Sequence, residues 1–388
     1  MEMNAIINAK ILKPDGTFIE NGCIFYNTKI IRITECADDI KDAKDVFDAK
    51  GAYLIPGLID AHCHLGMVGD SVGAEGDDGN EDTEPITPHL RAIDAIYPQD
   101  RGFKEAYKSG VTCVVTGPGS ANPIGGQFAA VKTFGNCVDK MIVKAPCAIK
   151  FALGENPKTI YSDKSEAPVT RMGTMALIRE ALYKAKEYER QLTLYQEDSE
   201  NNEKPEFDIK NDALVPLIRK EIPAKIHAHR ADDICSAIRL SKEFGINITL
   251  EHCTDGEIVA DIINENNIPV MLGPTLSDRS KPELSSLGFS IYKTLPDMGI
   301  DTAIITDHPE ITIDNLLLCA QLAVRNGMNP DAALSAITKT AAKNCGISGR
   351  VGTIAAGKDA DFAIFDKHPL DFTSKCIRTV IDGVTVHK

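Results

Sequence analysis

Two histidines that could share a metal ion stand one strand step apart near the start of the chain. Residues 53–66 read YLIPGLIDAHCHLG and place Asp60, His62 and His64 at alternate positions. Alternate side chains of a β-strand project from one face, so the pattern predicts that these three side chains point the same way. Neutral imidazole is a common ligand of divalent metals. Alone, a His-x-His pair fits two structural histidines equally well, so the metal hypothesis depends on the rest of the chain.

Further polar side chains stand at the ends of later strand-like runs. These are His227 and His229 on one face of residues 224–229, His252 in residues 247–253, and Asp307 at the end of residues 301–307. An interior strand normally avoids such residues, which makes their shared position at strand ends informative.

The elements that would position these groups alternate along the middle of the chain. Strand-like and helical segments follow one another from residue 57 to 349, which favours β/α units around a parallel sheet. About eight such units can be counted, the number that closes a (β/α)8 TIM-type barrel. Because the carboxyl ends of barrel strands meet at one mouth, we expect the histidines and Asp307 to meet there. The loops expected to line this mouth are residues 66–94, 117–127 and 156–171.

Both ends of the chain differ from the middle in their predicted secondary structure. Short β-rich runs with turn residues occupy residues 5–33 and 361–386, and the second stretch contains an Asp-Gly hairpin signal. We therefore predict a small β-sandwich domain built from residues 1–56 together with 350–388, and a barrel domain over 57–349. The acidic residues 196–210 predict an exposed insertion.

The composition fits a soluble intracellular enzyme or binding protein. Of 388 residues, 43% are hydrophobic and 25% charged, both ordinary fractions for a globular protein. The formal charge of −14 would repel nucleic acid and anionic membranes, and no apolar run is long enough to span a bilayer. Eleven cysteines without C-x-x-C spacing favour a reducing, cytoplasmic location. We expect a small-molecule substrate, no nucleic-acid or membrane partner, and a homo-oligomer.

Taken in order, these motifs resemble the amidohydrolase superfamily of metal-dependent hydrolases. The resemblance lies in the His-x-His pair, the later strand histidines and the strand aspartate, and in the flanks PGLIDAHCH (56–64) and GRVGTIAAGKDADFAIFD (349–366). It covers nearly the whole chain and is closest to the imidazolonepropionase-related and prolidase-like subgroup. It implies a barrel with a β-sandwich formed by the chain ends.

The resemblance also implies roles for residues. The more buried metal would be bound by His62, His64 and Asp307, the second by His227 and His252. A strand lysine, often carboxylated in this superfamily, would bridge them. Lys150, inside the apolar run of residues 147–153, is our candidate, because a buried lysine is costly unless neutralised or modified; Lys144 and Glu155 are alternatives.

Other polar residues have weaker claims on the site. His229 is either a substrate contact or a structural histidine, and Asp60 either orients His62 or makes a structural hydrogen bond. In imidazolonepropionase itself the corresponding strand pattern resembles His-Ala-Asp-Glu, whereas this chain has His227-Ala228-His229-Arg230. Arg230 could bind a substrate carboxylate or form a structural ion pair. Further candidate substrate contacts are Asn156, Tyr161 and Arg91. We expect His308, Cys63 and Cys253 to point away from the site.

The predicted chemistry is hydrolysis of a carbon–nitrogen bond. One or two divalent ions, zinc by preference and manganese or iron as alternatives, would lower the pKa of a water molecule. Asp307 would take its proton and pass it to the leaving nitrogen. The substrate would be a dipeptide, an N-acyl amino acid or a cyclic amide. The alternatives are a deaminase of a nitrogen heterocycle, which would lack the bridging lysine, and a catalytically silent scaffold, which would lose ligands.

Overall fold

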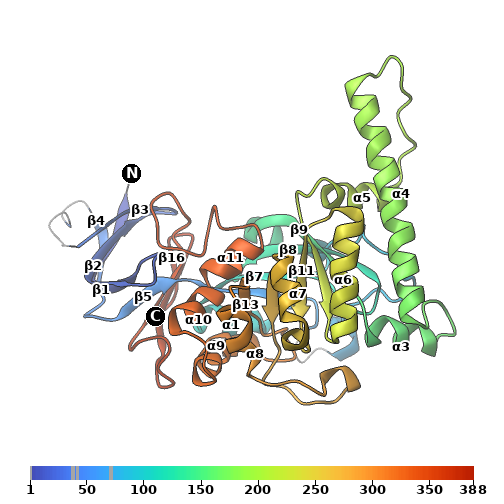
Figure 1. The fold of residues 1–388 in the computed structure, drawn as a ribbon. Helices are drawn as coiled ribbons and strands as arrows, with labels where there is room; N and C mark the ends of the chain where they lie inside the picture. The colour runs from blue at the N-terminus through green and yellow to red at the C-terminus, as the bar shows by residue number, and fades with distance from the viewer. Residues whose placement is uncertain (1, 36–39, 41–42, 70–72) are drawn as a thin grey trace.

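Two eight-stranded sheets carry the fold (Figure 1). The computed structural model describes residues 2–35, 40, 43–69 and 73–388. One sheet curves into the barrel and is called here the barrel sheet. The other, the end sheet, joins strands from both ends of the chain. No helix in the described part of the chain is both long and apolar enough to cross a lipid bilayer.

The barrel sheet has the order β13-β12-β11-β10-β9-β8-β7-β6. Its strands are β6 (Leu58–Cys63), β7 (Val111–Thr116), β8 (Ile124–Lys132), β9 (Ile142–Ala152), β10 (Ala224–Ala228), β11 (Ile248–His252), β12 (Val270–Leu272) and β13 (Thr302–Ile304). Backbone bonds from His64 to the His308 carbonyl and from Asp307 to the His62 carbonyl link the two outer strands beyond their ends. The barrel is therefore nearly closed, and the expected α/β fold is confirmed.

One strand departs from the regular pattern of parallel β/α units. β8 runs antiparallel to both β7 and β9, whereas β6–β7 and the neighbours from β9 to β13 pair in parallel. Only the short helix α2 (Val138–Met141) lies between β8 and β9. A parallel crossover needs a dozen or more residues, so this short connection allows only a return in the opposite direction.

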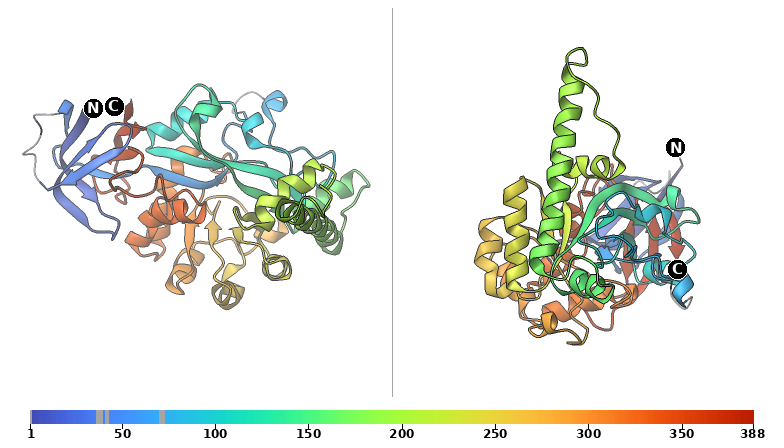
Figure 2. Two further views of the ribbon diagram at one scale, coloured as in Figure 1. Left: turned by 90° about the horizontal axis from the view of Figure 1, so that it is seen from above. Right: turned by 90° about the vertical axis from the view of Figure 1, so that its right-hand side faces the viewer.

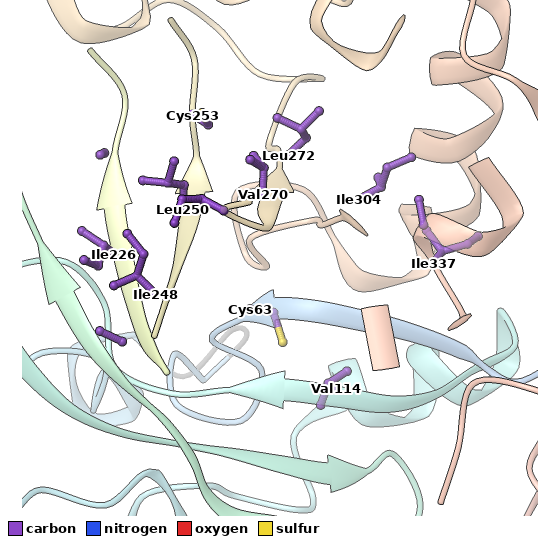
Figure 3. Close-up of a cluster of buried hydrophobic side chains, with 14 of the residues drawn as sticks. Cys63, Val114, Ile226, Ile248, Leu250, Cys253, Val270, Leu272, Ile304 and Ile337 are labelled. Carbon is purple, nitrogen blue, oxygen red and sulfur yellow. The ribbon is translucent and has the colours of Figure 1, made fainter. Parts of the chain in front are cut away.

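Helices cover the outside of the barrel. They are α1 (Arg101–Lys108), α3 (Glu155–Asp163), α4 (Arg171–Glu197), α5 (Ile209–Ile218), α6 (Ala231–Phe244), α7 (Ala260–Glu265), α8 (Ile291–Asp297), α9 (Leu316–Arg325), α10 (Pro330–Ala336) and α11 (Lys339–Asn344). Figure 3 shows part of the main core, to which successive strands contribute Ile226, Leu250, Leu272 and Ile304. All four side chains are fully or almost fully buried, which fixes the strands that carry the mouth.

The far half of α4 projects from the body of the barrel in Figure 1 and Figure 2. The acidic stretch 196–210 continues from the last residues of α4 through an irregular segment to the start of α5. Its side chains are almost all exposed, which agrees with the predicted surface insertion.

Both chain ends contribute to the end sheet, as predicted, and both termini lie at that end of the molecule (Figure 2). Its strands are β1 (Met3–Leu12), β2 (Phe18–Tyr26), β3 (Ile30–Thr34), β4 (Ala43–Asp48), β5 (Tyr53–Pro56), β14 (Phe362–Phe365), β15 (Cys376–Ile381) and β16 (Val384–His387). They form one continuous sheet in which β5 pairs with β14. The prediction of a β-sandwich is not confirmed.

Candidate metal centre

Three of the predicted ligands meet where β6 and β13 end. The Oδ1 atom of Asp307 lies 3.5 Å from Nε2 of His62 and 3.3 Å from Nε2 of His64. The Nδ1 atom of His64 donates to the Gly117 carbonyl over 2.7 Å, which turns Nε2 toward Asp307. Residue 117 belongs to the glycine-rich loop that we expected at the mouth. His62, His64 and Asp307 are called the first triad.

A second group of histidines lies beside the first triad. His227, His229 and His252 each offer a ring nitrogen, and these atoms all lie within 4.8 Å of one another. The ring centroids of His227 stand 4.6 Å from those of both His229 and His252. His252 lies between the two groups, with its ring centroid 5.5 Å from that of His62 and its nearest nitrogen 4.0 Å from Asp307. These three histidines are called the second triad.

An irregularity in β6 explains how His62 reaches the mouth. Opposite β7, Asp60 pairs with Val114 and Cys63 with Thr116, so three steps on one strand match two on the other. Such a bulge reverses the alternation between residues 60 and 63. The expectation that Asp60, His62 and His64 simply alternate on one face is therefore wrong at Asp60.

Asp60 supports the backbone and does not orient the His62 ring. Its carboxylate accepts from the backbone N–H of His62 (3.1 Å), and from the N–H (3.1 Å) and hydroxyl (2.5 Å) of Thr306. Burial raises the pKa of this carboxyl to about 7 in spite of these bonds. Of the two interpretations of Asp60, the structural hydrogen bond is the observed one, and it ties β6 to the segment that carries Asp307.

Glu251 is the carboxylate that faces the His62 ring. Its Oε2 lies 2.8 Å from Nδ1 of His62 and 3.0 Å from Nζ of Lys225, and its Oε1 accepts from the Thr249 hydroxyl over 2.5 Å. Both ionic side chains are buried. This environment favours a proton on Nδ1 of His62 and leaves Nε2 free to bind a cation. Sequence reasoning missed Glu251, although a glutamate inside a buried strand was a usable signal.

Left-handed backbone brings two ligands to the mouth. Glu251 already points inward on β11, so regular alternation would turn His252 out toward the helices. His252 has φ of 69° and Asp307 has φ of 55°, conformations that non-glycine residues adopt at some cost. The Nδ1 atom of His252 donates to the Gly273 carbonyl over 2.7 Å, which holds the redirected ring.

Lys150 occupies the place expected for a bridging lysine. Its Nζ lies 3.0 Å from Nε2 of His62, and the side chain is 1% exposed. Burial lowers the pKa of this amine to about 8, against the opposing effect of Asp307 and Glu251. The two alternatives lie elsewhere: Lys144 is half-buried near the start of β9, and Glu155 is the first residue of α3.

The buried histidines favour the uncharged form that binds metals. Burial, aided by Lys150, lowers the pKa values of His62 and His227 far below the ordinary range, and burial lowers that of His229 to about 4. The pKa of Asp307 stays low despite burial, because His252, His64 and Lys150 favour its anion. A carboxylate facing neutral imidazoles is a donor set suited to a divalent cation.

The first triad passes a simple test of fit for a metal. Two ligands of a tetrahedral zinc ion are separated by about 3.4 Å, close to the distances from Asp307 to the two histidines. Its Oδ1 is buried and has no hydrogen-bond partner. This carboxylate oxygen lies between two imidazole nitrogens, and the three atoms are therefore placed to bind one cation.

The predicted substrate contacts differ in their positions. Asn156 lies at the site, 3.4 Å from Nε2 of His227. Tyr161 is fully buried and its hydroxyl donates to Asn122, so it is placed as a structural residue. Arg230 is exposed and paired with Asp232, and Arg91 is likewise paired with Asp94, so the structural ion pair is the observed state of both arginines. Of the loops expected at the mouth, 66–94 includes residues 70–72, which lie outside the described residues, and much of 156–171 is helical in α3.

The residues expected to point away from the site do so. His308 is buried, and its Nδ1 accepts from the backbone N–H of Ile313. Cys63 and Cys253 both pack in the main hydrophobic core.

Glu283 is a second carboxylate that the sequence did not reveal. It belongs to the segment between β12 and α8, here called the mouth loop (residues 273–290), and is 2% exposed. Its Oε1 lies 3.7 Å from Nε2 of His227 and 3.9 Å from Nε2 of His229. Nothing in the surrounding loop sequence, which is rich in serine, distinguishes it from a surface glutamate.

A barrel with metal-binding groups at its strand ends defines a class of hydrolases, and comparison with known proteins identifies the family. The model of the amidohydrolase family matches residues 53–386. A crystal structure of an amidohydrolase from Thermotoga maritima is 38% identical, covers 99% of each chain and superposes with a TM-score of 0.94. The chain belongs to the amidohydrolase family, whose members are hydrolases of carbon–nitrogen bonds and generally depend on metals.

Curated relatives agree with this assignment. Amidohydrolase tasK of Hapsidospora irregularis is 29% identical over 374 residues, which are 89% of this chain and 38% of the relative. The imidazolonepropionase of Thermoplasma volcanium is 25% identical over 378 residues, which are 90% of this chain and 85% of the relative. The chain thus spans well under half of the fungal relative. The resemblance found in the motifs is confirmed.

Proposed function

We propose that this protein is a metal-dependent hydrolase that uses metal-activated water to cleave the amide C–N bond of a small molecule. The observation that carries the proposal is the unpartnered Oδ1 of Asp307, which lies between Nε2 of His62 and Nε2 of His64 at a mouth lined by further histidines. Such a group is placed both to bind a cation and to exchange a proton with a reacting molecule.

The side chains divide the work as follows. His62, His64 and Asp307 hold one divalent ion, and His227 and His252 contribute to a second. Zinc suits this donor set best, and manganese and iron are alternatives. When bound, the metal supplies a water of lowered pKa and polarises the substrate carbonyl. Asp307 would serve as the base that takes a proton from the attacking water and as the acid that returns it to the leaving nitrogen, and Glu251 would keep His62 in the tautomer that leaves Nε2 unprotonated.

Lys150 is proposed as the bridging ligand, in carboxylated form. Support comes from its burial and from the 3.0 Å separation between its amine and the ring of His62. A lysine in this place favours amide hydrolysis over the alternative, deamination of a nitrogen heterocycle. The two groups of possible metal ligands, which are His62, His64 and Asp307 and His227, His229 and His252, support an active enzyme over the catalytically silent alternative.

The substrate class is proposed as a dipeptide, an N-acyl amino acid or a cyclic amide. The imidazolonepropionase relative supports the amidohydrolase class without deciding among these. Asn156, 3.4 Å from His227, and His229 are the proposed substrate contacts. Arg230 would serve an acidic substrate only by leaving Asp232.

The wider organisation is proposed on the same footing. Residues 1–56 with 350–388 form one domain, and 57–349 form the catalytic barrel. Apart from Cys23, the cysteines in the described residues have free thiols, which supports a reducing, cytoplasmic location. We expect a homo-oligomer that engages neither nucleic acid nor membrane.

Metal analysis combined with a substrate screen tests the function. Protein purified without chelators is expected to contain one or two equivalents of zinc, manganese or iron, and to hydrolyse a member of a panel of dipeptides, N-acyl amino acids and cyclic amides. Asp307→Asn is expected to lower kcat at least about 100-fold, whereas the exposed Asp366→Asn leaves kcat unchanged. Metal-free native protein, or an unimpaired Asp307→Asn variant, would rule the proposal out.

A further inference from the structure

We propose, on the basis of the proposed function, that the second metal is bound by all three histidines of the second triad together with Glu283. Glu283 then attaches the mouth loop to the metal. This adds a loop carboxylate and His229 to the two histidines assigned above, and it makes His229 a metal ligand in place of a substrate contact.

The ring of His229 is held in a ligand-like orientation. Its Nδ1 lies 2.7 Å from the Thr254 hydroxyl, which leaves Nε2 facing His227 and Glu283. The ring stacks on that of His252, with an interplanar angle of 10° and a centroid separation of 4.8 Å. Three neutral imidazoles packed so closely offer one another no charge compensation, but together they can bind one cation.

The Oε1 atom of Glu283 is directed into this group. It is buried and has no hydrogen-bond partner, while Oε2 accepts from the backbone N–H of Glu155 over 3.1 Å. The distances of 3.7 and 3.9 Å from Oε1 to the two Nε2 atoms exceed those of hydrogen bonds. They come within a few tenths of an ångström of the separation of about 3.4 Å between two ligands of one zinc ion.

The cations near Glu283 are engaged with other partners. Within the described residues, no lysine or arginine forms an ion pair with it. Lys281 on the same loop donates instead to Asn156, and Arg171 pairs with Asp233. A buried carboxylate without an ion-paired cation is energetically costly. A divalent ion between Oε1 and the two histidines would remove that cost.

The backbone leaves space for this carboxylate. Gly154 has φ of 83°, and a Cβ atom there would stand 2.9 Å from Oε2 of Glu283. The segment between β9 and α3 thus accommodates the glutamate as closely as a glycine permits. We infer that Glu283 is held in place by its fit on one side and by the metal on the other.

Metal retention by the holoenzyme tests the proposal directly. Wild type, Glu283→Gln and His229→Gln are dialysed against increasing chelator, and bound metal is measured by mass spectrometry. Asp278→Asn, an exposed carboxylate on the same loop, is the matched control. We expect Glu283→Gln and His229→Gln to lose one equivalent at a chelator concentration at least about tenfold lower than wild type and control, and to retain the other.

A second measurement keeps the two variants interpretable if one of them folds poorly. Hydrogen–deuterium exchange of residues 276–289 is expected to be at least severalfold faster in the Glu283→Gln holoenzyme than in the wild-type holoenzyme, and unchanged by Asp278→Asn. The absorption spectrum of the cobalt-substituted protein is expected to change with loss of the ligand.

The outcomes separate this inference from the proposed function. If Glu283→Gln retains both equivalents with wild-type affinity, Glu283 is not a ligand; a change confined to KM would make it a substrate contact. If the wild-type enzyme hydrolyses amides with only the first-triad metal bound, the second site is wrong and the function stands. If the wild type binds no metal, both are wrong.

Discussion

Glu251 serves three partners with one buried carboxylate. It contacts His62, Lys225 and Thr249 and is fully excluded from solvent. The attraction of Glu251 raises the pKa of Lys225 although burial alone would lower it. The lysine therefore remains a cation inside the barrel, and its stability there depends on Glu251.

Replacing this glutamate is expected to affect both stability and metal binding. Glu251→Gln leaves Lys225 as an uncompensated buried charge, which should lower the free energy of unfolding by about 3–5 kcal/mol. It also removes the anion that faces Nδ1 of His62, so metal affinity should fall about 10–100-fold. Urea unfolding and chelator competition measure the two effects.

The matched control is a glutamate in a more exposed ion pair. Glu243 accepts from Arg179 on the outer surface, where such pairs contribute about 0.2–1 kcal/mol. Glu243→Gln should therefore change unfolding little and metal affinity not at all. Equal losses in the two variants would contradict a special role for Glu251.

The ligands could be predicted from the sequence, but the groups around them could not. Each of His62, His64, His252 and Asp307 stands at the end of an apolar run, which identifies it as a mouth residue. Glu283 comes from an irregular polar loop, where no periodicity indicates burial. Asp60 was misplaced because a bulge leaves no mark in a sequence that otherwise alternates.

At the scale of elements, the connection between β9 and α3 limits how the mouth loop can sit. Gly154 occupies a backbone conformation open to glycine, with φ of 83° and ψ of −137°, and directly faces Glu283. Any side chain here would have to displace the carboxylate or the connection.

Gly154→Ala should therefore combine strain with a local displacement. We expect a loss of about 1–3 kcal/mol in unfolding free energy from the backbone alone, together with faster hydrogen exchange in the mouth loop. Gly245→Ala, at the left-handed end of α6 with no atom within 4 Å of the added Cβ, is the control. It should cost about 1 kcal/mol and leave the mouth loop unchanged; an effect of Gly245→Ala on that loop would count against direct contact at Gly154.

The barrel strands were predictable as apolar runs, but the direction of β8 was not. The sequence predicts strands over 128–133 and 148–153, and the residues between these two runs are long enough for a parallel crossover. In the structure β9 already begins at Ile142, which shortens the connection from the end of β8 at Lys132. A buried strand has the same apolar sequence pattern in either direction, so only the connection length decides.

At the scale of the whole molecule, one buried lysine ties the barrel to the end sheet. Lys132, the last residue of β8, pairs with Asp359 (2.9 Å), Asp361 and Asp382 (3.2 Å). Arg350 adds a further bond to Asp359 over 2.8 Å. Lys29 also pairs with Asp359, so three cations face the three carboxylates. Burial nevertheless raises the pKa of Asp361 to about 6, against the opposing attraction of Lys132.

This raised pKa predicts a dependence of stability on pH. The folded protein retains a proton on Asp361 that the unfolded chain releases near pH 3.8. The associated stability is present below pH 3.8 and is lost as the pH rises to about 6, with a total of about 3 kcal/mol. In Asp361→Asn this component is absent. As the pH rises from 4 to 7, the unfolding free energy of the variant should therefore increase relative to that of wild type.

Urea unfolding at several pH values in this range measures the difference between the two curves. The exposed Asp366→Asn should follow the wild-type curve throughout. Parallel curves for wild type and Asp361→Asn would show that Asp361 ionises alike in the folded and unfolded states. Because the metal centre is unchanged in all three proteins, its own pH dependence cancels in the comparison.

The pairing of β5 with β14 also constrains the order in which the molecule can fold. Ile55 opposes Ala363, so the edge of β5 that does not pair with β1 lacks its partner until β14 has been synthesised. Such distant contacts slow folding, and an unpaired strand edge invites association with other chains. The barrel between these strands must bring them together. We therefore expect refolding yield to fall with protein concentration, and ribosome-bound chains stopped before residue 362 to keep β5 accessible to proteases and chaperones.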